Sequence, residues 1–78
     1  MISYADYNFG RLLQGLDSNS SLSNRTVVAF SSDHGEMAGD QNQILKRSMY
    51  EASTHVPLIV RGPDIRRGKT IDTPVSLV

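Results

Sequence analysis

The first part of the chain alternates apolar and polar residues with the period of a helix. Between Ile2 and Leu16 the apolar side chains recur at three and four residues, at Ala5, Phe9, Leu12, Leu13 and Leu16. This spacing places them on one face and predicts an amphipathic helix. The polar run that follows, from Asp17 to Asn24, is rich in turn-forming residues and predicts a surface loop.

Two short apolar segments predict β-strands. Thr26 to Ser31 is rich in β-formers without clean alternation, which is typical of a strand covered on both faces. Val56 to Gly62 is the second segment, and Pro57 belongs at its start or at a sheet edge, because proline donates no ladder hydrogen bond. The more polar connection between them predicts a loop from Glu36 through Gln43 and a short helical piece around Ser48 to Ser53.

The order helix, strand, long connection, strand indicates an α/β fold with helices on the faces of a sheet. Two strands and one or two helices do not cover both faces of such a sheet. The tail after Gly62 is rich in turn formers and ends on the largely apolar stretch PVSLV. We therefore expect residues 1–78 to be one part of a larger domain, truncated at both ends.

The composition excludes several classes of function. The 78 residues carry eight basic and eight acidic side chains, so no basic excess is present to bind nucleic acid or an anionic membrane surface. The chain has no cysteine, which excludes disulfides and thiolate metal sites. No apolar run approaches the ~20 residues of a membrane span, and the first residues lack the pattern of a secretory signal.

An acid and an imidazole stand directly after the first predicted strand, in the stretch FSSDHGE. Ligands of open α/β sheets bind at the carboxyl ends of strands, where Asp33 and His34 fall, and Gly35 allows a sharp turn there. The two side chains could ligate one metal ion, or Asp33 could cap a turn while His34 is a hydrogen-bonded surface residue. Calcium and zinc both require more ligands than this stretch supplies.

Several ordered motifs resemble the type I sulfatase family of the alkaline phosphatase superfamily. They are Ser32 to Gly35 after a strand, Lys46, Ser48 to Glu51, Val56 to Leu58, and Gly62-Pro63. With the preceding helix and the segment after Pro63, the resemblance covers nearly the whole chain. The residues of these motifs are most similar to those of arylsulfatase K-like members. The resemblance implies a mixed sheet flanked by helices, of which residues 1–78 form part of the catalytic domain.

The resemblance also implies roles for individual residues. Asp33 and His34 match the second pair of ligands to the active-site divalent metal, usually calcium, with His34 standing where asparagine is more frequent. Lys46 matches the lysine that contacts the sulfate group, where an ammonium neutralises developing charge; taken alone, it is a solvated loop lysine. His55 is a candidate substrate-binding residue at a point where many relatives carry arginine, and Glu36 is expected to hold the loop in place.

The family's nucleophile is missing from this chain. It is a formylglycine made from the Cys or Ser of a Cys/Ser-x-Pro-x-Arg motif, and residues 1–78 contain no such motif. The family's first metal pair, two adjacent aspartates, is also absent. We therefore expect no catalytic residue here and no activity in isolation, so that the remainder of the catalytic domain is needed.

The expected reaction of the parent enzyme is hydrolysis of a sulfate ester on a small molecule or glycan. Two alternatives stay open. One is a phosphodiesterase or phosphonate hydrolase of the same superfamily, in which Asp-His-Gly also follows a strand, and the other is a non-catalytic remnant or binding module. A eukaryotic arylsulfatase would be lysosomal or secreted, but these residues specify neither the substrate nor the compartment.

Overall fold

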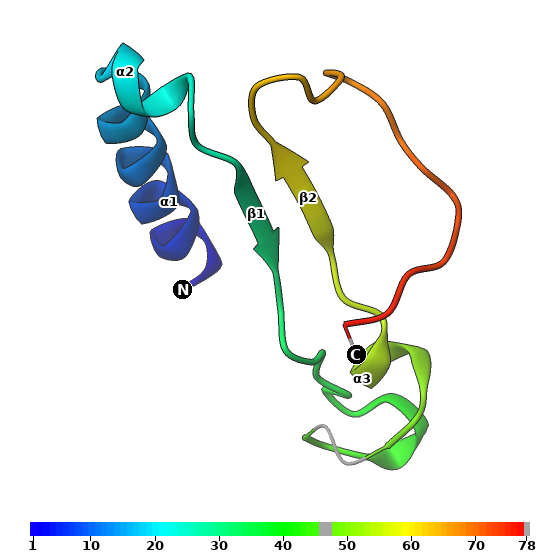
Figure 1. The fold of residues 1–78 in the computed structure, drawn as a ribbon. Helices are drawn as coiled ribbons and strands as arrows, with labels where there is room; N and C mark the ends of the chain where they lie inside the picture. Colours follow the sequence, from blue (N-terminus) through cyan, green and yellow to red (C-terminus); the bar gives the residue numbers. More distant parts are fainter. Residues whose placement is uncertain (46–47, 78) are drawn as a thin grey trace. The chain divides into compact units, whose positions relative to one another are not determined.

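The computed structural model describes residues 1–45 and 48–77. The elements follow in the order α1 (Ile2–Asp17), α2 (Ser20–Ser23), β1 (Val28–Ser31), the 3₁₀ turn η1 (Asp40–Asn42), α3 (Glu51–Thr54) and β2 (Leu58–Arg61) (Figure 1). The α/β fold class expected from the sequence is confirmed. The chain divides into two compact units, one built from residues 1–28 and 61–67, and the other from residues 29–60 and the tail that starts at residue 68.

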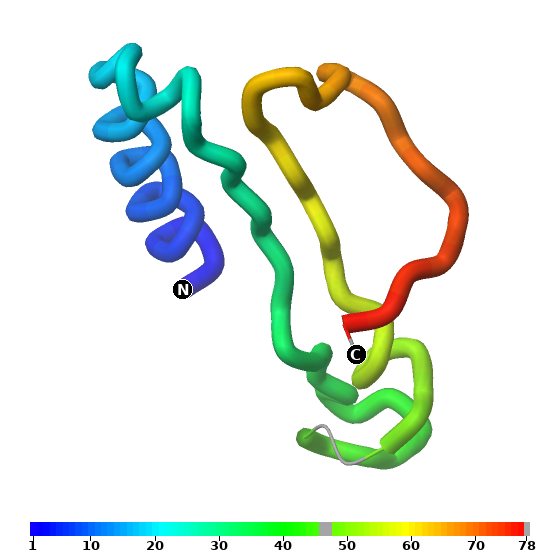
Figure 2. The backbone as a smooth tube through the Cα atoms, in the orientation of Figure 1, coloured from blue at the N-terminus to red at the C-terminus, as the bar shows by residue number. Residues whose placement is uncertain are grey.

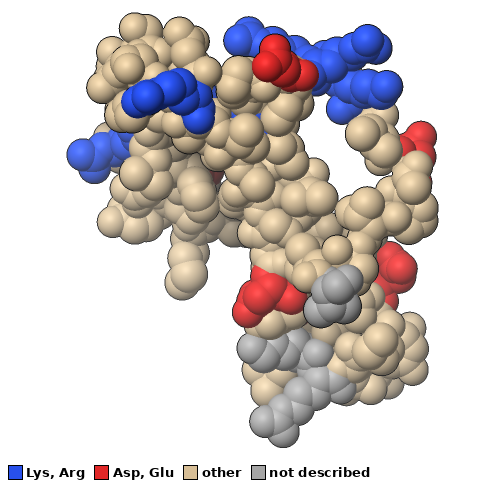
Figure 3. All heavy atoms as spheres, viewed as in Figure 1, with Lys and Arg blue, Asp and Glu red and all other residues tan. Residues whose placement is uncertain are grey.

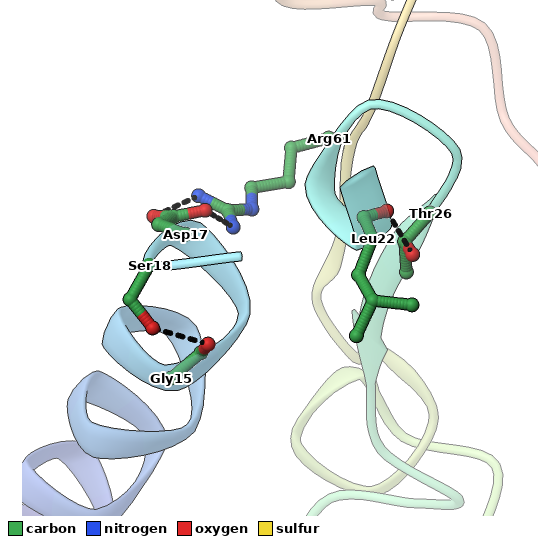
Figure 4. A network of polar contacts seen from close by, with 6 residues as sticks. All are labelled: Gly15, Asp17, Ser18, Leu22, Thr26 and Arg61. Carbon is green, nitrogen blue, oxygen red and sulfur yellow. Dashed lines mark hydrogen bonds and ion pairs between the residues drawn. The ribbon is translucent and has the colours of Figure 1, made fainter. Parts of the chain in front are cut away.

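Helix α1 ends one residue beyond the predicted boundary, and its last turn is closed by Ser18, whose hydroxyl donates to the Gly15 carbonyl at 2.8 Å (Figure 4). The apolar stripe that predicted this helix is not buried within the described residues. Phe9 is 47% exposed and Leu12 is 69% exposed. The periodicity therefore gave the right element, but among the described residues no side chain of the stripe is buried, and Leu13 and Leu16 are only half-buried.

The polar run predicted to be a loop contains a short helix, α2, so this prediction was wrong. Asn19 is the N-cap, and its Oδ1 accepts a hydrogen bond from the Leu22 amide at 3.2 Å. At the other end, the Thr26 hydroxyl donates to the Leu22 carbonyl at 2.6 Å (Figure 4). Residues that favour turns are also the best helix N-caps, so composition alone does not separate a loop from a capped helical turn.

Strands β1 and β2 form a two-stranded antiparallel sheet (Figure 1). The Ser31 hydroxyl donates to the Pro57 carbonyl at 2.8 Å, so the carboxyl end of β1 lies beside the residue that precedes β2. Both strands are shorter than predicted, and Pro57 stands just before β2, as its missing N–H group requires.

Helix α3 begins later than the predicted helical piece around Ser48 to Ser53. Tyr50 is extended (φ −71°, ψ 154°) and acts as the N-cap, so the helical turn covers only Glu51–Thr54. After β2, the described residues form no further helix or strand, and the backbone runs as an irregular tail (Figure 2). None of the described helices combines the length and apolar character needed to cross a membrane.

The described residues bury very little surface. Among them, only Met37 and Ser53 fall below one-tenth exposure, at 2% and 3%. All four residues of β2 are exposed, including Leu58, Ile59 and Val60, and so are three of the four residues of β1. Much of the visible surface is accordingly neither acidic nor basic (Figure 3). This exposure agrees with the expectation that two strands and a few helices cannot cover a sheet on both faces.

A charged pair joins the end of α1 to the end of β2. The Arg61 guanidinium donates from Nη1 to Asp17 Oδ2 at 3.2 Å and from Nη2 to Asp17 Oδ1 at 2.6 Å (Figure 4). These hydrogen bonds, and then the guanidinium charge, hold the pKa of Asp17 below its ordinary value, and the same hydrogen bonds raise the pKa of Arg61. Both side chains stay about half exposed, so the pair orients the two ends more than it stabilises the fold.

The Asp17–Arg61 pair predicts a pH dependence. Because the folded-state pKa of Asp17 is lowered, the pair stabilises the folded state above the ordinary carboxyl pKa, and this contribution disappears as pH falls through the lowered value. In an Arg61→Gln variant we expect the pKa of Asp17, followed by NMR of its carboxyl carbon, to rise toward the ordinary value. Arg66→Gln removes the same charge from another position of the same unit and should change the Asp17 titration little. An unchanged titration in Arg61→Gln would contradict the pair.

Candidate functional site

The polar turn after β1 is held by its own side chains. The Ser32 hydroxyl donates to the His34 carbonyl at 2.8 Å, and the His34 amide donates to Asp33 Oδ1 at 3.0 Å. Because Asp33 Oδ1 is bonded to the next backbone amide, the orientation of the carboxylate is fixed relative to the turn. The two residues that the sequence singled out therefore lie together at the end of a strand, as expected.

The ring of His34 has a defined orientation. Its Nδ1 lies 2.8 Å from the Gly35 carbonyl oxygen. Since a carbonyl oxygen only accepts hydrogen bonds, we assign the ring proton to Nδ1. The other ring nitrogen, Nε2, lies 3.2 Å from Asp33 Oδ2. With the proton on Nδ1, Nε2 is the acceptor nitrogen of the ring and lies beside a carboxylate oxygen.

This arrangement fits part of a metal site. A metal-ligating histidine commonly donates its other ring N–H to a carbonyl oxygen, as His34 does to Gly35. The Asp33 side chain is 83% exposed and that of His34 is 36% exposed, so both remain accessible. Within residues 1–45 and 48–77, no group of three or more His, Cys, Asp or Glu side chains is placed to hold a metal. Asp33 and His34 thus provide two donor atoms, fewer than a calcium or zinc ion requires.

Helix α3 contacts the turn through Gly35. The Gly35 amide donates to the Ser53 carbonyl at 2.7 Å. A Cβ atom at Gly35 would lie 2.0 Å from the Ala52 carbonyl oxygen, which no side chain can tolerate without backbone movement. The positive-φ glycines among the described residues are Gly39 and Gly68, so Gly35 is not needed for an unusual backbone angle. The sequence marked Gly35 as a sharp turn, whereas the structure requires glycine there for space.

The contact between Gly35 and α3 brings His55 into the same pocket as Asp33 and His34. This pocket has a volume of about 430 Å³ and lies within the second unit. His55 ends α3, and its Nδ1 lies 2.9 Å from Glu51 Oε2, one helical turn earlier. Three of the four predicted site residues therefore line one pocket. The fourth, Lys46, lies outside the described residues.

These observations define an α/β protein with a carboxylate–imidazole pair at the end of a strand. The comparison with known protein families identifies the family. The sequence profile of the Sulfatase family matches residues 1–78, and the chain belongs to the sulfatase family. The predicted resemblance to this family is thereby confirmed. No solved structure matches the chain.

Several relatives match all or most of the chain. It is 46% identical over 78 residues to arylsulfatase K of Xenopus laevis, and the alignment covers 100% of this chain and 14% of that protein. It is 53% identical over 57 residues to human arylsulfatase K, in an alignment that covers 73% of this chain and 11% of that protein. A sulfatase of Formosa agariphila is 36% identical over 77 residues, in an alignment that covers 99% of this chain and 15% of that protein. The chain therefore spans about one seventh of the length of these relatives.

The close approach at Gly35 predicts that even the smallest side chain is disruptive there. In the full-length protein we expect Gly35→Ala to lower the free energy of unfolding by about 1–3 kcal/mol, because the added methyl group overlaps a backbone carbonyl. Gly10→Ala is the matched control, since no atom lies within 4 Å of its added Cβ. It should be neutral or stabilising by about 0.5–1 kcal/mol. Urea denaturation measures both effects, and equal stability of the two variants would refute the steric argument.

Proposed function

We propose that the chain is part of a sulfatase that hydrolyses sulfate esters, and that Asp33 and His34 are two ligands of its divalent metal ion. The observation that carries this proposal is the pairing of His34 Nε2 with Asp33 Oδ2 at 3.2 Å, while Nδ1 is bonded to the Gly35 carbonyl. That tautomer presents a nitrogen lone pair and a carboxylate oxygen side by side, which is the donor set a cation needs.

Calcium is the cation we propose, with one oxygen donor from Asp33 and one nitrogen donor from His34. When bound, a divalent cation polarises the oxygens of the group that is attacked. The backbone of this chain orients the two side chains that would hold the ion: the His34 amide bonds to the Asp33 carboxylate, and the Gly35 carbonyl bonds to the His34 ring. The remaining ligands and the formylglycine nucleophile would come from the rest of the catalytic domain.

Two further residues are proposed to face the substrate. Lys46 would contact the sulfate group, because an ammonium stabilises negative charge on sulfate oxygens as sulfur is attacked. His55 lines the same pocket as the proposed ligands, and its ring is held by Glu51, which supports a role in binding substrate. The substrate class is a sulfated small molecule or glycan. If the parent is a eukaryotic arylsulfatase, we expect it to be lysosomal or secreted.

Sulfate-ester chemistry is favoured over the phosphorus chemistry of related enzymes. The relatives described above carry the names arylsulfatase K and sulfatase. The coding sequence upstream of this chain tests the choice. A Cys/Ser-x-Pro-x-Arg motif supports a formylglycine sulfatase, whereas a lone Thr or Ser nucleophile without that motif would favour a phosphodiesterase or phosphonate hydrolase.

Metal affinity tests the proposed ligands directly. In the full-length protein, Asp33→Asn or His34→Ala should weaken calcium binding, measured by isothermal titration calorimetry, by at least about 10- to 100-fold. His34→Asn should retain more affinity than His34→Ala, because an amide oxygen is a calcium ligand.

The matched control is His55→Asn, which changes the other imidazole of the same pocket. It should leave the calcium affinity nearly unchanged, since we assign His55 to the substrate and not to the metal. Equal calcium affinity in the native protein and in His34→Ala would exclude His34 as a ligand.

The chain by itself should be neither stable nor active. Its apolar strand and helix residues are exposed, and a fold with so little buried apolar surface does not offset the conformational entropy lost on folding. We expect circular dichroism of the 78-residue polypeptide to show no cooperative thermal transition, and we expect no hydrolysis of an aryl sulfate. A sharp, cooperative melt of a monomer would contradict this expectation.

A further inference from the structure

Two Asn-x-Ser/Thr triplets lie between α1 and β1, and the proposed function uses neither of them. They are Asn19-Ser20-Ser21 and Asn24-Arg25-Thr26. A triplet of this kind, with any residue but proline in the middle, is the acceptor for N-linked glycosylation in proteins that enter a secretory pathway. Because the attached glycan is bulky and hydrated, an occupied acceptor lies on the surface of the folded protein.

The first triplet is part of helix α2. Asn19 is the N-cap, and its Oδ1 accepts the hydrogen bond from the Leu22 amide. Ser20 and Ser21 are the first two residues of the helix, so all three residues of the triplet take part in this helical turn. Glycosylation acceptors are typical of surface loops, and the conformation of this triplet therefore disfavours it.

The second triplet leaves α2 and leads toward β1. Asn24 is the C-cap of the helix, with φ −72° and ψ −7°, and its amide donates to the Ser20 carbonyl at 3.1 Å. Arg25 donates from its amide to the Leu22 carbonyl at 3.0 Å and from Nε to the Ser21 carbonyl at 3.1 Å. Backbone bonds and the arginine side chain thus hold this turn without a contribution from the Asn24 side chain.

The Asn24 side chain is exposed, and within residues 1–45 and 48–77 it makes no hydrogen bond. The third residue, Thr26, is half-buried, and its hydroxyl closes the end of α2 through its bond to the Leu22 carbonyl (Figure 4). A group attached to Asn24 Nδ2 therefore breaks no contact among the described residues.

The segment around Asn24 also differs in polarity from the surfaces that the rest of the domain would cover. The run from Asp17 to Asn24 is largely polar, whereas α1 and β2 expose apolar side chains such as Leu12 and Val60. Burying apolar surface is favourable, while burying polar groups costs free energy unless they find new partners. We expect the run that ends at Asn24 to stay at the surface of the full-length protein.

We propose that Asn24 carries an N-linked glycan in the full-length protein. In this reaction Asn24 Nδ2 attacks the anomeric carbon of an oligosaccharide that is carried on a lipid diphosphate. A C–N bond forms, the C–O bond to the diphosphate breaks, and the lipid diphosphate leaves with the proton that Nδ2 loses. The donor belongs to the secretory pathway, so the inference rests on the lysosomal or secreted location in the proposed function.

Mass spectrometry of the full-length protein tests the assignment. The protein is expressed from its complete coding sequence in cultured animal cells, and its peptides are treated with a peptide N-glycosidase in heavy-oxygen water. The enzyme converts each glycosylated asparagine into a labelled aspartate. We expect the label at Asn24, with lower occupancy at Asn19. Asn24→Gln should lose one glycan and migrate faster on a denaturing gel.

Three control variants separate glycosylation from the local structure. Thr26→Val removes the hydroxyl that the triplet requires and should abolish the glycan although Asn24 is still present. Thr26→Ser keeps a hydroxyl both for the triplet and for the Leu22 carbonyl, and it should retain the glycan. Asn19→Gln is the matched control at the other triplet and should leave the Asn24 glycan in place.

The outcomes distinguish this inference from the proposed function. An unmodified Asn24, or fuller occupancy at Asn19, overturns the inference. Asn24 is not among the residues that line the pocket, so Asn24→Gln should hydrolyse an aryl sulfate with a kcat/KM within about twofold of the native value. A glycan at Asn24 in a protein without this activity would refute the sulfatase function and leave the inference standing. An active sulfatase with an unmodified Asn24 would do the reverse.

Discussion

The hydrogen bond from the Gly35 amide to the Ser53 carbonyl is the contact on which the candidate site depends. It joins the turn after β1 to α3 at a distance that leaves no room for a side chain on Gly35. Since α3 ends at His55, the same contact places the second imidazole beside the Asp33–His34 pair. A single close approach between two backbone segments thereby gathers residues that are about twenty positions apart.

The site is organised by polar contacts and not by a hydrophobic core. Among the described residues, Met37 is the buried apolar side chain, while the apolar residues of β1, β2 and α1 remain largely exposed. The turn after β1 is nevertheless held by specific hydrogen bonds at Ser32, His34 and Glu36. Local bonding thus fixes the chemistry of the turn even where the surrounding surface is uncovered. This agrees with a chain that spans about one seventh of its relatives.

Successive residues after β1 have different roles in the proposed site. Asp33 and His34 present donor atoms, Gly35 admits the neighbouring helix, and Glu36 and Met37 hold the loop beyond. Each task depends on a different property: charge and lone pairs, the absence of a side chain, and acceptor or apolar surface.

The sequence by itself determined the elements and the identity of the polar turn, because periodicity, strand composition and the order of motifs are local properties of the chain. It located α1, both strands, and Asp33 and His34 at the end of β1, and it indicated the sulfatase family. The loop predicted for the polar run that contains α2 was wrong, because the same residue types form loops and cap short helical turns. Only the tertiary structure showed that Gly35 is required for space and that His55 shares the pocket, because both depend on a contact between segments far apart in sequence.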